Sequence, residues 1–422
     1  MSAALDFPAE LQDLIIDHMH GQKQALGTCG LVSKAWLRSS RHHLFGSATL
    51  RNHDLDGFLQ LLHSPLASFL QSIISLSSEL DEGKLLDKLV HNLPIFPALR
   101  HLRLSYIYWD EVSDSTTDAM VQLFGNITKL DLHLVAFNAP RHMATFISRF
   151  PRLEEMSLYP AVLQSAPEEL RTPHVPPTLR TVRFRSDASA PMDSFVTWLH
   201  TGESPPAIRA LEVGILSVAA LPSLSDLLRA LGPSLVELDL ALMYHVTPAD
   251  ITAHLDFTRN TQLQHLTIHL SLRRFHTSAG GANAPWALLS AVRAPISTLT
   301  IVLKLDTVDV LDNLDWAYLN RTLQTLPHLA ALRRLHFMVH CASGAMDQVE
   351  DALRRRLSED TACHVVDVSV LHTARMFTQA FAEHPTSASA ASALQALNGV
   401  HNLYSAAHDS DTPPIGMKLG VL

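Results

Sequence analysis

Apolar residues recur along most of the chain in the pattern apolar-x-x-apolar-x-apolar. Nine copies are clear, and their central residues are Leu102, Leu130, Met156, Val182, Leu211, Leu238, Leu266, Leu299 and Leu335. Successive central residues are 28, 26, 26, 29, 27, 28, 33 and 36 positions apart. A weaker copy at Cys363, Val366 and Val368 follows the last of them, and Gln71, Ile74 and Leu76 form a possible earlier one. A recurring period of this size indicates stacked, similar structural units.

The segments between these copies predict helices. Apolar residues with helical spacing follow Pro140, precede Gly232, follow Thr247-Pro248, and extend from Met346 to Leu357, where Glu350 and Arg354 can pair. We therefore predict an α/β fold, a right-handed solenoid with parallel strands on its concave face and helices on its convex face. A doubly wound α/β domain would also have short strands, but it would not explain the recurring period.

The first 50 residues have a different pattern. Leu11, Leu14, Ile15 and Met19 fall on one face of a predicted helix that begins near Pro8, and a second apolar line runs through Leu26, Cys29, Val32 and Trp36. Ser33 can cap a third helix that ends near Phe45. Three helices this short cannot bury all these side chains among themselves. The apolar surface that remains exposed indicates that these helices bind a partner or contact the rest of the chain.

Several motifs in this segment resemble the F-box type that is abundant in fungi. They are Phe7-Pro8-Ala9-Glu10-Leu11, Ile15-Ile16-Asp17, Cys29-Gly30-Leu31-Val32-Ser33-Lys34-Ala35-Trp36 and Ser40-Arg41-His42-His43-Leu44-Phe45. Phe7 stands where the family usually has Leu, and Gly21 lies where the first helix connects to the second. The repeats, which mostly lack the Asn common after the last strand leucine, resemble the degenerate leucine-rich repeats that follow F-boxes.

The resemblance implies a function in ubiquitin transfer. It implies that the helices dock on a Skp-family adaptor and, through it, on a cullin–RING ligase, while the repeats hold an unknown protein substrate. The implied adaptor-binding residues are Phe7, Pro8, Leu11, Ile15, Leu31, Val32 and Trp36. Two alternatives stay open: helices that only cap the first repeat, and a leucine-rich-repeat scaffold with no link to ubiquitin.

Strand alternation also predicts which side chains face the concave side, since successive residues point to opposite faces. The early repeats place basic residues there, whereas Glu212, Glu237 and Asp239 make the middle acidic. The candidate substrate-binding residues are His101, Arg103, Lys129, Arg183 and Arg185. An acidic or phosphorylated protein segment is the expected ligand.

The predicted organisation is a three-helix F-box over residues 5–50, a linker helix over 51–68, a repeat domain over 69–383 and a flexible tail over 384–422. The tail segment is rich in small and polar residues and contains Pro385, Pro413 and Pro414.

Composition narrows the function classes. The 422 residues are 47% hydrophobic and 17% charged, as expected of a globular chain, and the net charge of −9 argues against a nucleic-acid partner. No stretch approaches the length of a membrane span and the N-terminus does not resemble a secretory signal, so we expect a cytoplasmic or nuclear protein. Cys29, Cys341 and Cys363 have no CxxC spacing and fit reduced, packing cysteines.

Motifs for catalysis are lacking. The sequence contains no GxSxG, P-loop or GxGxxG motif, and its 25 histidines are scattered without zinc-site spacing. We therefore expect a noncatalytic protein with no cofactor and no metal. An enzyme site formed by the loops is a distant alternative.

Overall fold

The computed structural model describes the chain from residue 8 to residue 372 with internal gaps. The described ranges are 8–20, 22–64, 67–80, 83–137, 139–159, 174–184, 189–200, 207–243, 245–272, 283–305, 307–341, 346–357 and 366–372. Phe7, Arg185 and the predicted tail over 384–422 lie outside the described residues.

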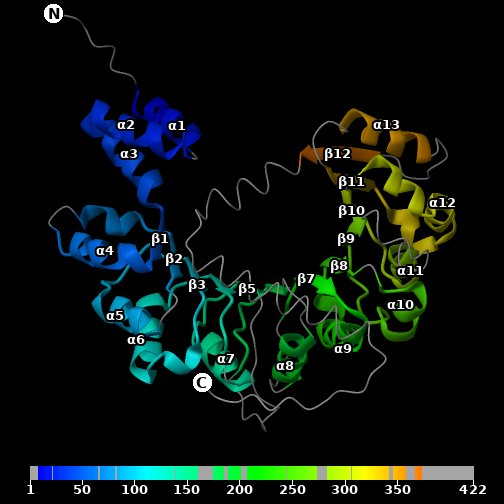
Figure 1. The fold of residues 1–422 in the computed structure, drawn as a ribbon, viewed down its shortest axis with the longest axis horizontal. Coiled ribbons are helices and arrows are strands. Elements are labelled where there is room, and N and C mark those ends of the chain that lie inside the picture. The colour runs from blue at the N-terminus through cyan, green and yellow to red at the C-terminus, as the bar shows by residue number, and fades with distance from the viewer. Residues whose placement is uncertain are drawn as a thin grey trace, which may run out of the picture.

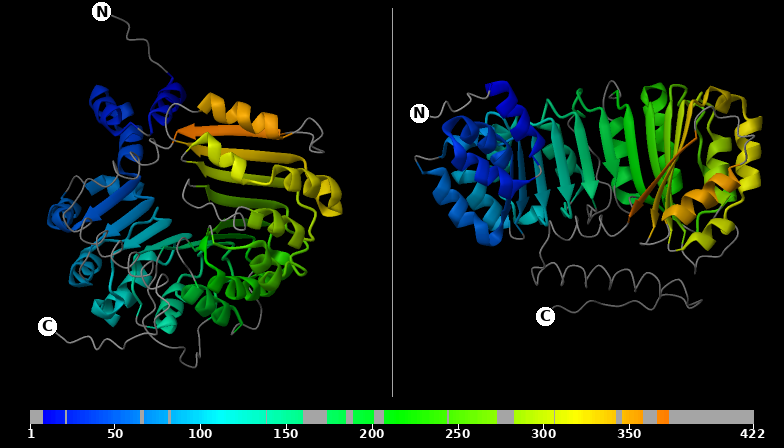
Figure 2. Two further views of the ribbon diagram at one scale, coloured as in Figure 1. Left: turned by 45° about the vertical axis from the view of Figure 1, so that its right-hand side comes forward. Right: turned by 90° about the horizontal axis from the view of Figure 1, so that it is seen from above.

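A single parallel sheet forms the frame of the molecule. Its twelve strands are hydrogen-bonded in sequence order, from β1 to β12. They are β1 (Ser47–Arg51), β2 (Ser75–Glu79), β3 (His101–Ser105), β4 (Lys129–His133), β5 (Glu155–Tyr159), β6 (Thr181–Phe184), β7 (Ala210–Leu216), β8 (Glu237–Leu242), β9 (His265–Leu272), β10 (Thr298–Leu305), β11 (Arg334–Cys341) and β12 (Val366–His372). The sheet curves into an arc, with the strands on its inner side (Figure 1) and running side by side when seen from above (Figure 2).

Helices cover the outer side of this arc. Three of them, α1 (Ala9–His18), α2 (Lys23–Val32) and α3 (Lys34–Phe45), precede the first strand and stand at one end of the arc (Figure 1). The helices between the strands are α4 (Leu55–Leu62), α5 (Gly83–Asn92), α6 (Asp114–Phe124), α7 (Pro140–Ser148), α8 (Ser189–His200), α9 (Leu221–Leu231), α10 (Pro248–His254), α11 (Ala284–Ala291), α12 (Trp316–Thr325) and α13 (Met346–Arg356). Among the described residues, no helix is both long enough and apolar enough to cross a membrane.

The strand register confirms the repeat pattern. The central residues of the predicted copies face one another across neighbouring strands, from Leu102 opposite Leu130 to Leu335 opposite Val366. The first apolar position of each copy is buried as well, as at Leu99, Ile127 and Leu153. Because one face of each strand is covered by helices, these aligned columns form a continuous core. The molecule is thus an α/β protein with a solenoid-like parallel sheet.

The helix boundaries follow local signals that the sequence carries. Pro140 stands at the first position of α7, and Gly232 ends α9 with a φ of +51°. Glycine tolerates this left-handed conformation because it has no Cβ. Thr247 and Asp250 form a reciprocal capping box at the start of α10, and Arg354 Nη2 lies 2.8 Å from Glu350 Oε1 on α13.

The sheet begins earlier than the sequence predicts. β1 pairs with β2 and lies inside the range assigned to the N-terminal helices, so the solenoid starts at Ser47 and the 51–68 segment belongs to its first unit. That segment does contain the expected helix, α4. The register places Leu76 opposite Leu102, so the early copy is centred on Leu76 and not on Ile74. Few apolar residues in β1 and β2 contribute to the core, which explains why their copies are hard to recognise.

Asn260 connects two successive units. Its side chain is fully buried, and its Nδ2 donates to the carbonyl oxygens of Leu228, at 2.9 Å, and Gly232, at 3.0 Å. These carbonyls lie at the C-terminal end of α9, where helix carbonyls lack the full set of intrahelical bonds, although that of Leu228 also accepts from the Gly232 backbone N–H. Asn260 therefore satisfies a helix end from the next unit of the solenoid.

We expect Asn260→Ala to lower the free energy of unfolding by about 2 kcal/mol, since it removes two buried hydrogen bonds, those to the carbonyl oxygens of Leu228 and Gly232. Urea unfolding measures this change. The matched control is Asn92→Ala, because the Nδ2 of Asn92 also donates to a helix carbonyl, that of Lys88, but at the surface. The control should change stability by less than about 0.5 kcal/mol. Equal losses for the two variants would contradict the role assigned to Asn260.

Candidate protein-binding surfaces

The three N-terminal helices have a small core of their own. Ile16, Leu26 and Cys29 are buried together, and Met19, Trp36 and Leu44 pack against them. This cluster is separate from the large core of the sheet. Ser33 caps α3 as predicted, since its Oγ accepts a hydrogen bond from the Trp36 backbone N–H at 3.2 Å.

Two polar side-chain contacts connect α1 with α3. The His43 Nε2 lies 2.7 Å from Asp17 Oδ1, and Ser39 Oγ donates to Asp13 Oδ1. At its other end α3 meets the sheet domain, where the rings of Phe45 and Phe69 are 4.9 Å apart. The three helices are thus joined by a small apolar core and by polar contacts, and Phe45 connects the unit to the sheet domain.

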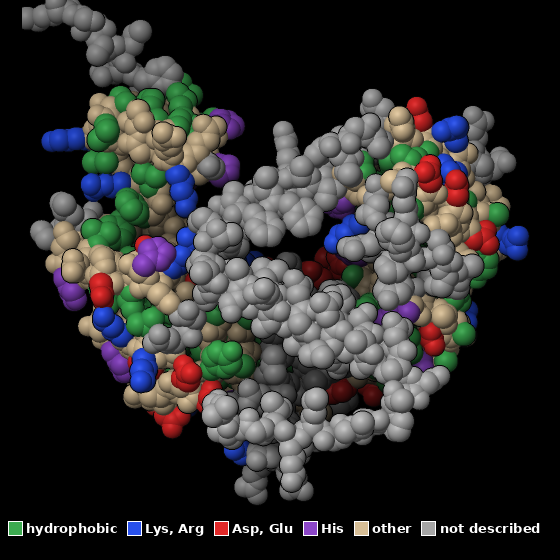
Figure 3. Space-filling view, in the orientation of Figure 1, with side chains coloured by type: hydrophobic (Ala, Val, Ile, Leu, Met, Phe, Trp, Pro, Cys, Tyr) green, Lys and Arg blue, Asp and Glu red, His purple; other side chains and the backbone are tan. Residues whose placement is uncertain are grey.

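Most of the predicted adaptor-binding residues are exposed. Leu11 and Ile15 on α1 are 47% and 36% exposed, and Leu31 and Val32 at the end of α2 are 88% and 64% exposed. Leu14 is exposed too, at 55%. We call Leu11, Leu14, Ile15, Leu31 and Val32 the N-terminal apolar surface. Hydrophobic side chains gather over these helices in the space-filling view (Figure 3).

Two details differ from the sequence-based expectation. The fully buried residue of α1 is Ile16, which falls outside the predicted apolar face, and Val32 does not join the inner line that was predicted through Leu26, Cys29 and Trp36. The face of each helix that packs against the small core is narrower than the stripe of apolar residues on that helix, so some of the apolar side chains remain exposed to solvent. Pro8 is exposed, whereas Trp36 is half-buried against the small core.

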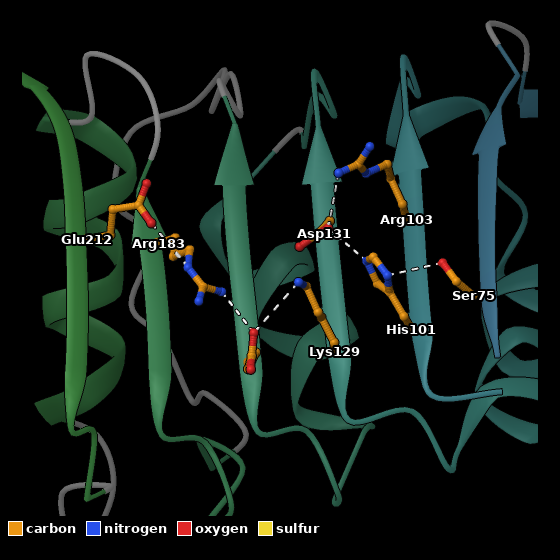
Figure 4. Close-up of polar contacts among 8 residues, drawn as sticks. Ser75, His101, Arg103, Lys129, Asp131, Arg183 and Glu212 are labelled. Atoms are coloured by element: carbon orange, nitrogen blue, oxygen red, sulfur yellow. Dashed lines mark hydrogen bonds and ion pairs between the residues drawn. The ribbon is translucent and has the colours of Figure 1, made fainter. Parts of the chain in front are cut away.

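A second candidate surface is the concave face of the early strands (Figure 4). His101 Nε2 lies 2.7 Å from Asp131 Oδ2, its Nδ1 lies 3.1 Å from Ser75 Oγ, and Arg103 Nη2 lies 3.4 Å from the same Asp131 oxygen. These contacts connect β2, β3 and β4. The carboxylate of Asp131 on β4 thus contacts both basic side chains of β3.

The next strands continue this arrangement. Lys129 Nζ and Arg183 Nη1 lie 3.8 Å and 2.9 Å from Glu155 Oε2, and Arg183 Nε lies 3.1 Å from Glu212 Oε2. We call these residues, from Ser75 on β2 to Glu212 on β7, the concave charge ladder. Side chains of opposite charge alternate along it because equivalent repeat positions lie on neighbouring strands, about 4.8 Å apart.

The ladder corrects the expected charge of this surface. The candidate substrate-binding residues His101, Arg103, Lys129 and Arg183 do share the concave face, as predicted, but each has a carboxylate partner. Their positive charge is therefore largely compensated and does not form a basic field. The acidic partners occupy the same repeat position one repeat further along the chain, as Glu155 does opposite Lys129 and Glu212 opposite Arg183.

Asp131 is the most strongly perturbed member of the ladder. Burial alone would raise its pKa, but the hydrogen bond and the charge of His101 outweigh burial, with a further contribution from Lys129. Together they hold the pKa of this carboxyl well below its usual range. Asp131 therefore stays ionised at any pH at which the protein is expected to work.

The later concave strands differ from the early ones. β9, β10 and β11 each have eight residues, whereas β3, β4 and β5 have five, so the later strands add positions beyond the repeat pattern. Lys304 and His340 occupy such positions, and the sequence analysis did not include them. On the neighbouring strands, His269 Nε2 lies 2.9 Å from Asp239 Oδ1.

Comparisons with known proteins do not assign the chain to a family. No family model matches the chain, and a search of curated proteins finds no match. Within the described part of the chain, no group of three or more His, Cys, Asp or Glu residues is arranged to hold a metal ion. The candidate surfaces therefore rest on geometry alone, and both are suited to contacts with another macromolecule.

The half-buried position of Trp36 gives a first prediction. Trp36→Ala should destabilise the three-helix unit by about 3 kcal/mol, because it removes a large side chain from a small core. Hydrogen exchange over residues 8–45 should increase while exchange in the sheet stays unchanged. Tyr108→Ala is the control, because Tyr108 is 55% exposed and its removal should have little effect. Protection equal to that of the unmodified protein would contradict the packing role of Trp36.

A second prediction concerns Asp131. Because its pKa is lower in the folded state, the ionised carboxylate stabilises the fold above its ordinary pKa of 3.8, and this contribution is lost as the pH falls below that value. Asp131→Asn should therefore lower the free energy of unfolding by about 2 kcal/mol at neutral pH and by less at about pH 3.

Urea unfolding at the two pH values measures this difference, with Asp118→Asn as the control. Asp118 pairs with Arg149 between α6 and α7, but its side chain is 62% exposed, so its replacement should have a small effect. A loss for Asp131→Asn that is the same at both pH values would show that its charge is not the cause.

Proposed function

We propose that this protein is a noncatalytic substrate-recognition subunit of a Skp–cullin–F-box ubiquitin ligase. In this proposal the helices α1–α3 are an F-box that docks on a Skp-family adaptor, and the sheet and its helices are a solenoid of degenerate leucine-rich repeats that holds a protein substrate. The cullin–RING ligase is reached through the adaptor. The protein works inside the cell, in the cytoplasm or the nucleus.

The observation that carries the proposal is the N-terminal apolar surface. Single exposed apolar residues are common, but five of them on two short helices, α1 and α2, are a larger surplus, and Leu31 is 88% exposed. Four of the five, Leu11, Ile15, Leu31 and Val32, are residues to which the F-box resemblance assigns adaptor contact. Burial of these side chains against a partner would supply the hydrophobic part of a docking interface.

The mechanism needs no chemistry from this chain. A subunit that holds a substrate on the solenoid and an adaptor on its N-terminal helices raises the effective concentration of the acceptor lysine near the charged ubiquitin carrier. The arc suits this task, since its strands lie side by side on the inner side and form one continuous sheet (Figure 2). The concave charge ladder gives that face a defined pattern of charges, and such patterns favour specificity over raw affinity.

A scaffold without a ubiquitin ligase is the second candidate. Its support is the contact between Phe45 and Phe69, through which α3 closes the end of the sheet domain. A unit that serves only as a cap would turn its apolar side chains toward the domain that it covers. The exposure of Leu31 and Val32 therefore favours the adaptor-binding function over the capping function.

Leu11→Ala combined with Leu31→Ala should weaken binding of a Skp-family adaptor by at least about 30-fold, because a central anchor residue contributes about 2 kcal/mol to an interface. Copurification and direct titration with the adaptor measure the loss. Both residues are exposed, so thermal unfolding and circular dichroism should be unchanged.

Ile95→Ala is the matched control. Ile95 is also an exposed apolar residue, at 69%, but it lies in the segment between α5 and β3 of the sheet domain. This variant should retain the adaptor fully. If the unmodified protein fails to bind any Skp-family adaptor, the ligase function is wrong and the scaffold function is favoured.

A further inference from the structure

The longer strands place a histidine and a lysine side by side on the concave face. In the register of β10 and β11, Lys304 lies directly opposite His340. Strand alternation places Lys304 on the same face as Thr298 and Thr300, and His340 on the same face as Arg334 and His336. His269 lies on the adjacent strand β9, and its side chain faces the same side. Basic and His side chains are seen at the inner edge of the arc where β9–β11 run (Figure 3).

The charge of Lys304 is not compensated in the way that the charges of the concave charge ladder are. Lys304 is exposed, and among the described residues no carboxylate lies within ion-pair distance of it. In the early strands, by contrast, Arg103, Lys129 and Arg183 all contact carboxylates. The uncompensated positive charge of the concave face is therefore on the later strands and not on the early strands that the sequence favoured.

His340 adds a ring nitrogen that has no partner among the described residues. Its side chain is only 6% exposed, and its Nδ1 forms no hydrogen bond with the described residues. A buried polar atom is normally paired, so an unpaired one indicates a ligand or a water that completes it. On the same face Val302, which is 3% exposed, and the partly exposed Met338 provide an apolar floor that strengthens electrostatic interactions nearby.

The groups around His340 disfavour its protonation. Burial, then the charge of Lys304 on β10 and that of His269 on β9, lower the pKa of His340. His269 is itself paired with Asp239 on β8, and the residue opposite His340 on β12 is the apolar Leu371. Within the described residues no carboxylate faces His340 directly. An anion placed between Lys304 and His340 would reverse this balance, because it would favour the charged imidazole.

We propose that Lys304 and His340 form an anion-binding subsite that takes a carboxylate or phosphate group from an acidic segment of a protein partner. Lys304 supplies a fixed positive charge, and the Nδ1–H of the charged His340 imidazole donates a hydrogen bond to an anionic oxygen. His269 on β9 is already paired with Asp239 and is not part of the subsite. This inference rests on the proposed binding of a protein substrate to the concave face. It assigns the substrate an acidic character and assigns the contact to β10 and β11.

The subsite implies a definite pH dependence. A bound anion raises the pKa of His340, so binding takes up a proton, and affinity should rise as the pH falls from about 8 to about 6, by up to about tenfold per pH unit for one proton. Sulfate is the suitable probe because it does not titrate in this range. Nuclear magnetic resonance of the histidine side chains, with His340 identified by His340→Gln, follows both binding and the imidazole pKa.

The full-length protein is titrated with sulfate, and Lys304→Gln and His340→Gln are compared with Arg183→Gln. We expect Lys304→Gln to weaken sulfate binding by about tenfold at every pH, as the loss of one charge-assisted contact does. We expect His340→Gln to flatten the pH dependence. Arg183→Gln should change neither, since Arg183 is already paired with Glu155 and Glu212.

Two further probes identify the source of the anion. Phosphoserine and N-acetylglutamate are titrated in the same way: tighter binding of phosphoserine assigns a phosphorylated partner, and comparable binding assigns an acidic one. A His340 signal that does not respond to any of these anions would overturn the inference. Loss of binding in Arg183→Gln, but not in Lys304→Gln, would also overturn it. Adaptor binding is measured separately, so failure of the subsite leaves the test of the ligase function intact.

Discussion

Parallel pairing in a constant register is the constraint on which the structure depends. Each strand meets the next with equivalent repeat positions opposite each other, as Leu102 meets Leu130 and Leu130 meets Met156. Apolar positions therefore stack into continuous columns on the helix side, and polar positions stack into columns on the concave side. A shift of one residue in any strand would exchange these two faces, so the hydrophobic core and the pattern of surface charges are fixed together.

This constraint explains which parts of the fold are predictable from the sequence. The core columns, the breaks at Pro140 and Gly232, and the cap at Thr247 depend on residues that are near one another in the chain, and they form as expected. The first two strands are harder to recognise, because Ser75, Ser77 and Ser78 of β2 give little hydrophobic signal. Their place in the sheet is determined by pairing with a neighbour and not by their own composition.

The candidate surfaces, too, have features that the sequence predicts and features that depend on tertiary packing. Exposure of Leu31 on α2 depends on how three helices pack, and helical periodicity alone does not distinguish a side chain in a small core from one beside it. Ile16 and Ile15 are adjacent in sequence, yet only Ile16 is buried. On the concave face the described basic side chains of the early strands lie where strand alternation predicts, but their net charge depends on carboxylates such as Asp131 and Glu155 one repeat away. The net charge at a point on a sheet surface depends on the side chains at equivalent positions of neighbouring strands, so it can be predicted only when the strands are compared with one another.

The change in strand length along the solenoid connects this geometry with recognition. In the early strands the described basic residues of the concave charge ladder each have a carboxylate on a neighbouring strand, so their charges are largely compensated, and a ligand would have to compete with existing ion pairs. The extra positions of β10 and β11 lie outside the alternation that produces those pairs, and Lys304 and His340 are placed beside each other with no acidic neighbour in the described strands. The charge of Lys304 disfavours protonation of the neighbouring His340, and an external anion bound between them would favour the charged imidazole. The same register that neutralises one half of the arc therefore leaves the other half able to bind an acidic partner.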